Sequence, residues 1–156
     1  MLEAAAVDRG KVDATGSPEV PTADAVLAPL HLFERPLALL RITNSRISLF
    51  HVRVQGDGTE AMGFLLRRLF DLEAMIEPLA DGSFALLFVR YNEDQAAMTA
   101  RVLRTIRDAM GVPAFEGRSR VDISAVHRHS GFIGEAEDLF AELAAKVANG
   151  SDIVAP

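Results

Sequence analysis

The feature that most constrains this chain is the stretch LADGSFALLFVR, Leu79–Arg90, in which a turn signal precedes an almost wholly apolar run. Asp81-Gly82 is typical of a tight turn between two strands. Phe84–Val89 then supplies only apolar residues, as expected for a strand that is buried in a sheet. The sequence therefore predicts a β-hairpin made of Met75–Leu79 and Ser83–Tyr91.

The rest of the chain alternates between strand-like and helix-like patterns. Further strands are predicted at Pro36–Ile42, Ile47–Val54, Arg120–His127 and Ile153-Val154, from runs of branched and aromatic residues. Helices are predicted near 59–72, 94–110 and 135–148, where apolar residues recur with helical spacing. Thr59 and Asn92 are the expected caps of the first two helices. The predicted fold class is α+β, a mixed central sheet with helices packed on it.

The first 33 residues are expected to stand apart from this domain, which then spans residues 34–156. They mix small and polar residues without apolar periodicity, which is typical of a flexible tail. Their last part is more apolar and is interrupted by Pro29. A short docking segment is therefore predicted there, with these side chains as the contact: Val26, Leu27, Leu30, Leu32 and Phe33. The alternative is that the segment folds back over its own sheet.

The composition of the chain limits the kinds of site, the cellular location and the binding partners that we expect. The chain of 156 residues has no cysteine, so disulfides and thiolate metal sites are excluded. The N-terminus lacks an apolar signal region and no run is long enough to span a membrane, which favours a cytoplasmic protein. A formal charge of −6 gives no general attraction to nucleic acid or to anionic lipid. Neither is expected as a partner.

From about residue 36 to residue 154, the order of elements resembles the GGDEF domain, the bacterial diguanylate cyclase module. That family makes cyclic di-GMP from two GTP molecules on a ferredoxin-like palm. Its signature lies on a hairpin before a buried strand, and here that place is taken by Ala80, Asp81, Gly82, Ser83 and Phe84. PLALLRIT is similar to the family's first strand, GTEAMGFLLRRL to the next helix, and RVDIS and AAKVANGSDIV to the closing segments.

The departures from the family concern its metal ligands. Diguanylate cyclases hold two divalent cations with carboxylates from the first strand and the hairpin tip, since such ions need oxygen ligands. In the alignment that the resemblance implies, these positions read Arg41 and Ser83, a cation and a neutral hydroxyl. Ala80-Asp81 replaces the two signature glycines. The resemblance thus implies no metal, no cofactor and no catalytic residue.

Two further motifs of the family are missing. The segment that reads guanine is replaced by SRISLFHVRV, and the product-inhibition motif is replaced by the short connection Asp71-Leu72-Glu73-Ala74. The leading hypothesis is a catalytically inactive GGDEF-like module that acts in cyclic di-GMP-related regulation through a protein partner, which includes a second copy of itself. Two alternatives stay open: a non-catalytic receptor for GTP or cyclic di-GMP, and an enzyme with an unrelated site.

Other polar constellations have ordinary interpretations. His127 and His129 would share a face of a continuing strand, but a metal site needs further ligands. Asp57 and Glu60 beside a helix start favour capping over phosphate binding. The repeat Arg101, Arg104 and Arg107 favours a solvated helix face over an acidic partner. No serine has a histidine and a carboxylate at a motif spacing, although such groups can assemble in space.

Overall fold

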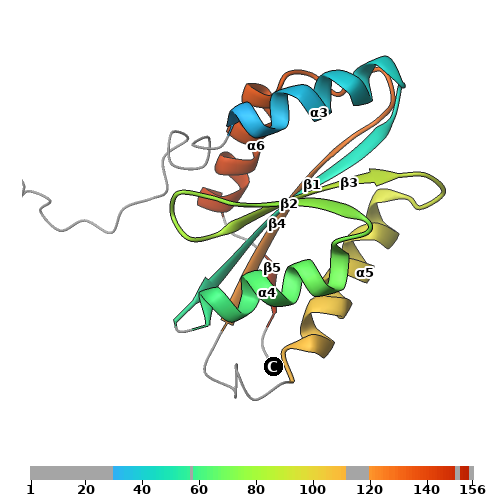
Figure 1. The fold of residues 1–156 in the computed structure, drawn as a ribbon. Coiled ribbons are helices and arrows are strands. Elements are labelled where there is room, and N and C mark those ends of the chain that lie inside the picture. The colour runs from blue at the N-terminus through green and yellow to red at the C-terminus, as the bar shows by residue number, and fades with distance from the viewer. Residues whose placement is uncertain (1–29, 57, 112–119, 150–151, 155–156) are drawn as a thin grey trace, which may run out of the picture.

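The computed structural model describes residues 30–56, 58–111, 120–149 and 152–154. Five strands of this part form one sheet in the order β2-β3-β1-β4-β5 (Figure 1). Their bounds are β1 Arg46–Gln55, β2 Ala74–Pro78, β3 Phe84–Arg90, β4 Arg120–Arg128 and β5 Asp152–Val154. Neighbouring strands in this order are all antiparallel.

The antiparallel sheet corrects the prediction of a mixed sheet. A strand–helix–strand order suggests a parallel pair, and β1 and β2 do run in the same direction. However, β3 lies between them and pairs antiparallel with each. The helix between β1 and β2 therefore crosses over an inserted strand, which the element order alone does not specify.

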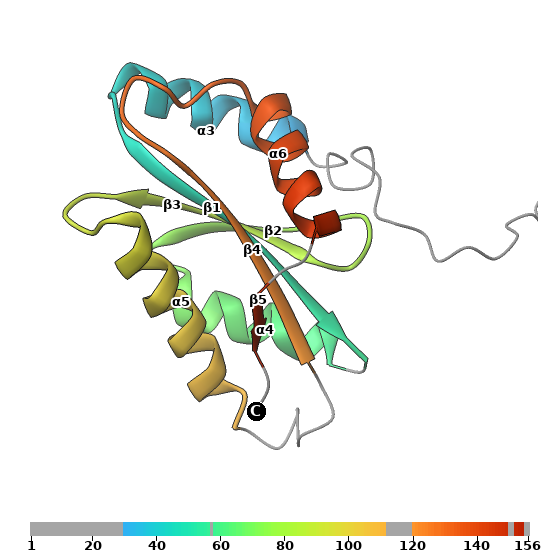
Figure 2. The same ribbon diagram turned by 180° about the vertical axis from the view of Figure 1, so that it is seen from behind.

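Four helices of the described residues cover the two faces of the sheet (Figures 1 and 2). Their bounds are α3 Leu30–Ile42, α4 Thr59–Phe70, α5 Gln95–Ala109 and α6 Ala136–Asn149. Helices α4 and α5 lie on one face, and α3 and α6 lie on the other. No helix of the described residues has the length and apolar character that crossing a membrane requires.

Each face of the sheet has its own apolar core, and the same strands supply both because successive side chains alternate between faces. Under α4 and α5, Phe50 and Phe88 make an edge-to-face contact with ring centroids 5.6 Å apart. Under α3 and α6, Phe33 packs on Phe140 at 4.9 Å. The central strands β1 and β3 are therefore buried on both faces, which explains the continuous apolar run of β3; β1 is buried too but includes Ser48 and His51.

The structure corrects the strand predicted at Pro36–Ile42, which is part of helix α3. The side chains that pack on the core from this helix follow helical spacing: Leu30, Phe33, Leu37 and Leu40. Pro36 removes one backbone donor inside the helix, and the buried apolar face holds the helix despite that loss. The strand prediction began at the proline and so divided the helical pattern.

The remaining predicted elements are confirmed within a few residues at their ends. The hairpin, the strands of β1 and β4, and the helices α4, α5 and α6 all lie where the sequence placed them. The predicted caps were wrong. Gly58 precedes α4 without a side-chain cap, and Asp94, not Asn92, caps α5 by accepting a hydrogen bond from the N–H of Ala97.

Candidate functional site

The hairpin tip between β2 and β3 is a tight turn that its own backbone holds together. The N–H of Leu79 donates to the carbonyl of Ser83 at 2.8 Å, and the N–H of Gly82 donates to the carbonyl of Leu79 at 3.0 Å. Gly82 has a φ of 84°, which glycine adopts without strain. Asp81 Oδ1 accepts a hydrogen bond from the N–H of Ser83 at 3.0 Å. The predicted turn at Asp81-Gly82 is confirmed.

A histidine of β1 joins this turn. His51 Nε2 lies 2.8 Å from Ser83 Oγ, and the Ser83 hydroxyl also donates to the Asp81 carboxylate. A hydroxyl has one proton, so a Ser83 that donates to Asp81 accepts from Nε2–H of His51. This assignment leaves Nδ1 of His51 without a proton. That atom is buried and has no hydrogen-bond partner among the described residues.

Burial and hydrogen bonding set the protonation of His51 and Asp81. His51 is 1% exposed and Ser83 is fully buried. Burial lowers the pKa of His51 to about 4, although the charge of Asp81 acts in the opposite direction. Burial alone would raise the pKa of Asp81, but two hydrogen bonds from Ser83 and nearby positive charge together lower it. At neutral pH the cluster therefore holds a neutral imidazole and an ionised carboxylate.

Charged side chains continue from this cluster along the same face of the sheet. Arg53 lies opposite Asp122 in the register of β1 and β4. The charge of Arg53 lowers the pKa of His51 and that of Asp122 raises it, so the two partly cancel at the histidine. Asp122 also accepts a hydrogen bond from Gln55 and lies 3.5 Å from the Arg120 guanidinium. Its Oδ2 is hydrogen-bonded within the sheet, whereas Oδ1 has the ion pair with Arg120 but no hydrogen bond in the described part of the chain.

The composition serine, histidine and aspartate does not make a hydrolytic triad here. In such a triad the carboxylate bonds the histidine, and the histidine activates an accessible serine. Asp81 instead bonds Ser83, and neither Ser83 nor His51 reaches the surface. Within the described ranges, no group of three or more His, Asp or Glu side chains could hold a metal ion. The arrangement is suited to fixing the hairpin on β1.

The two residues expected at metal positions, Ser83 and Arg41, have different partners in the structure. Ser83 is part of the cluster above. Arg41 lies near the end of α3, where its guanidinium donates to the carbonyl of Gly134 and pairs with Glu135 at 3.3 Å. The alignment of Arg41 with a strand residue beside the hairpin was wrong, because the strand that pairs with β3 is β1.

His51 is the residue that contacts the hairpin tip instead, and no site was predicted for it. The available signal was a single imidazole in the run ISLFHV, whose other members are apolar except Ser48. A polar side chain in a strand buried on both faces needs a partner inside the protein. That argument predicts a buried contact for His51, but only the fold identifies Ser83 as the partner.

The predicted docking segment divides at the start of α3. Val26 and Leu27 lie outside the described residues. Leu30 packs against the core, Leu32 is 39% exposed, and Phe33 is fully buried against Phe140. The expectation that Phe33 lies outside the core, with the domain beginning at residue 34, was wrong. This part of the segment covers its own sheet, which was the alternative interpretation.

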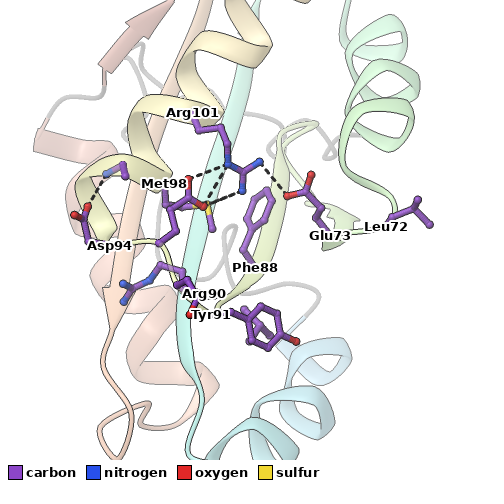
Figure 3. A pocket seen from close by; sticks show the side chains of 12 residues that line it. Leu72, Glu73, Phe88, Arg90, Tyr91, Asp94, Met98 and Arg101 are labelled. Atoms are coloured by element: carbon purple, nitrogen blue, oxygen red, sulfur yellow. Dashed lines mark hydrogen bonds and ion pairs between the residues drawn. The ribbon is translucent and has the colours of Figure 1, made fainter.

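A pocket of about 600 Å³ lies between α5, the end of β3 and the connection that follows α4 (Figure 3). Arg101 reaches across it from α5 and pairs with Glu93 and Glu73, each at 3.0 Å. Arg101 is therefore half-buried and ion-paired rather than on a freely solvated face as predicted, whereas Arg104 and Arg107 are exposed. The hydrogen bonds that Arg101 donates to Glu93, followed by the charge of Glu73, raise the pKa of Arg101 against the effect of burial.

His127 and His129 do not form a pair. His127 Nδ1 lies 2.7 Å from Ser48 Oγ, and its Nε2 lies 3.2 Å from Thr99 Oγ1, so both ring nitrogens are occupied. Burial and nearby cations lower the pKa of His127 to about 4. His129 follows the end of β4 and is exposed. The other predicted pair stays untested because Asp57 lies outside the described residues.

Comparison of the chain with protein-family models, with curated proteins and with solved structures finds no match.

Proposed function

We propose that this chain is a non-catalytic module with the fold of a GGDEF domain, which acts in regulation by binding another protein. From β1 to β4 the elements follow the order β-α-β-β-α-β, with α4 and α5 on one face. Four of the strands lie in the order β2-β3-β1-β4. This order and the inserted β3 support a ferredoxin-like arrangement, as the resemblance to cyclases implies.

The observation that carries the proposal is the closed cluster at the hairpin tip. A cyclase of this type would need several carboxylate oxygens there to hold divalent cations. Asp81 is the one acidic residue of the tip, and its Oδ1 already accepts two hydrogen bonds from Ser83. The β1 residue at this place is a neutral, buried imidazole rather than a carboxylate. These side chains support a hairpin that stabilises the fold without binding metal.

An exposed apolar surface beside β2 supports the binding role. A groove of about 430 Å³ is bordered by Leu39 of α3, by Leu72 and by Met75 of β2. Leu39 is 60% exposed and Leu72 is 99% exposed. The outer edge of β2 is unpaired within the described part of the chain. The β2 edges of two copies of this chain can pair with each other and bury Leu39 and Leu72 of both copies. A second copy is therefore the first partner to test, in a two-fold homodimer.

The absence of cysteine makes the dimer contact directly testable. A Leu39→Cys variant with a short thiol crosslinker should give a covalent dimer if the groove is the contact. Phe64→Cys on α4 is the matched control, because Phe64 is also an exposed apolar residue but lies on another face. A dimer trapped by Phe64→Cys and not by Leu39→Cys would place the contact elsewhere.

The catalytic part of the proposal is tested with GTP and Mg²⁺ or Mn²⁺. We expect no cyclic di-GMP above a no-protein control in single-turnover assays. The double variant His51→Asp with Ser83→Glu should also make none, since the guanine-reading segment of the family is missing as well. Product formed by the natural chain would overturn the proposal.

The 600 Å³ pocket favours a second function, a receptor that binds GTP or cyclic di-GMP without turnover. Its volume is in the range of small-molecule sites. The carboxylates of Glu73 and Glu93 act against the binding of a phosphate group in this pocket, because they already form ion pairs with the guanidinium of Arg101. Thermal unfolding with each nucleotide separates the two functions: a ligand that binds only the folded state raises the melting temperature, and Arg101→Ala should remove that rise.

A further inference from the structure

A second, smaller pocket lies at the end of the sheet where β1 begins and β3 ends. It has a volume of about 360 Å³. Three segments line it: the turn from α3 to β1, the last residues of β3 with those that follow, and Ser130 after β4. Its polar lining residues are hydroxyls, amides and two guanidiniums: Thr43, Ser45, Ser130, Tyr91, Asn44, Asn92, Arg46 and Arg90. No carboxylate is among the residues that line it.

The two arginines of this pocket are opposite each other in the sheet. Arg46 is the first residue of β1 and is the register partner of Arg90, the last residue of β3. Like charges that lie directly opposite on neighbouring strands destabilise a sheet. Neither guanidinium forms an ion pair with any acidic residue of the described ranges. The pair thus concentrates positive charge on a protein whose formal net charge is −6.

Arg90 is also buried without the partners that a guanidinium needs. It is 4% exposed. One of its nitrogens donates to the carbonyl of Arg128 at 3.0 Å, and its Nε is buried with no hydrogen-bond partner in the described part of the chain. A guanidinium has five N–H donors, and a buried charge with unsatisfied donors is costly. An anion in the pocket would give this guanidinium an acceptor of opposite charge.

The charges around Arg90 do not supply this anion from the protein itself. Burial and then the charge of Arg46 lower the pKa of Arg90, and the opposing effect of Asp94 is the smallest of the three. Asp94 is committed to capping α5 through the N–H of Ala97. His127 on the same face is hydrogen-bonded at both nitrogens, and the charge of Arg90 helps to keep it neutral.

We propose that this pocket binds the phosphoryl group of a small phosphorylated molecule, with Arg46 and Arg90 as the charged ligands of its oxygens. Two guanidiniums match the charge of a phosphate dianion, and guanidinium N–H groups are well suited to phosphate oxygens. The hydroxyls of Ser45 and Ser130 line the same space. Tyr91, which is 78% exposed, borders the pocket and offers an aromatic face to the rest of the ligand.

This site is independent of the hairpin cluster and of the function proposed from it. Arg46 begins β1, whereas the hairpin tip contacts β1 near His51. A Ser83→Ala variant that still folds should therefore bind phosphate as the natural chain does. The 600 Å³ pocket shares Val89, Arg90, Tyr91 and Asn92 with this one, so Arg101→Ala separates the two sites: it should leave phosphate binding here unchanged.

Inorganic phosphate and pyrophosphate are the probes, at millimolar concentrations and constant ionic strength. Thermal unfolding and calorimetric titration of the full chain should show binding, with pyrophosphate the stronger ligand. Arg46→Gln should weaken binding by about tenfold or more, the effect of losing one charged hydrogen-bonding group. Arg104→Gln is the matched control, because it removes one exposed arginine from α5 and should leave binding unchanged.

Two further measurements test the proposal: the melting temperature without ligand, and the binding of a carboxylate. Without ligand, Arg46→Gln should raise the melting temperature, since it removes a like charge opposite Arg90. Succinate tests whether a carboxylate can replace the phosphoryl group. It should raise the melting temperature of the natural chain less than pyrophosphate does. The proposal is overturned if neither phosphate probe binds, if Arg46→Gln binds them as well as the natural chain does, or if succinate binds equally tightly.

Discussion

Ser83 holds the hairpin to the centre of the sheet through one hydroxyl group. Its Oγ contacts both His51 Nε2 and the Asp81 carboxylate, and no part of the side chain is exposed. Ser83→Ala would leave a second nitrogen of His51 buried without a partner, in addition to Nδ1. We expect the free energy of unfolding to fall by about 1–3 kcal/mol, the usual effect of an unsatisfied buried polar atom.

Chemical denaturation at neutral pH measures this change. Ser130→Ala is the control, since Ser130 is only partly buried and has no such contacts in the described structure. Equal stability of the two variants would show that the Ser83 hydroxyl is not a structural tie.

His51 also makes stability depend on pH. Its pKa is lowered from 6.5 to about 4 by burial, so the unfolded chain binds a proton more readily than the folded chain does. Stability is therefore retained above pH 6.5 and is lost as the pH falls from 6.5 toward 4. The full shift corresponds to roughly 3 kcal/mol.

Urea denaturation across this pH range tests the prediction with glutamine variants. His127 has a pKa lowered in the same direction and contributes to the same loss. His51→Gln and His127→Gln should each flatten part of the pH profile, and the double variant should flatten most of it. A profile that keeps its slope in the double variant would assign the effect to the carboxylates instead.

At the scale of elements, α3 is part of the folded domain. Phe33 is fully buried against Phe140 of α6, and Leu37 packs on the same core. Phe33→Ala should lower the free energy of unfolding by about 3–5 kcal/mol, as for other large aromatic deletions in cores. Leu32→Ala, one residue away and 39% exposed, should change it by less than about 1 kcal/mol.

The burial of Phe33 determines where the N-terminal part of the chain can be truncated without loss of the core. Removal of residues 1–33 would take away a core side chain, so any loss of stability would say nothing about docking. A truncation that ends before Leu30 keeps α3 complete. Similar effects of Phe33→Ala and Leu32→Ala would contradict the packing of this helix.

At the scale of the whole molecule, the two cores share their strands. Side chains of β1 and β3 point alternately under α4 and α5 or under α3 and α6. Loss of either core exposes one face of the same sheet, so the domain should unfold in a single cooperative transition. Phe70→Ala on one face and Phe140→Ala on the other should each lower the midpoint of that one transition.

Circular dichroism and hydrogen exchange measure this cooperativity with independent probes. Both variants remove a fully packed phenylalanine, so they are matched in size and burial. Coincident transitions are expected for the natural chain and for each variant. Two separate transitions in either variant would mean that the helices of one face can detach while the sheet persists.

The sequence by itself determined most elements and the turn between β2 and β3. Asp81-Gly82 and the apolar runs act locally, through backbone preferences and periodicity, so a short window contains the information. The amphipathic helices α4, α5 and α6 follow for the same reason. The helical nature of Pro36–Ile42 was also present in the sequence, but only in a window that extends back to Leu30.

Only the tertiary structure decided which side chains meet. His51 and Ser83 are 32 residues apart, and Arg46 and Arg90 come together through the register of β1 on β3. Strand order and register depend on the packing of both faces of the sheet at once, which no local pattern specifies. For that reason the sequence marked Arg41 and Ser83 as one site, and the fold separated them and gave each a different partner.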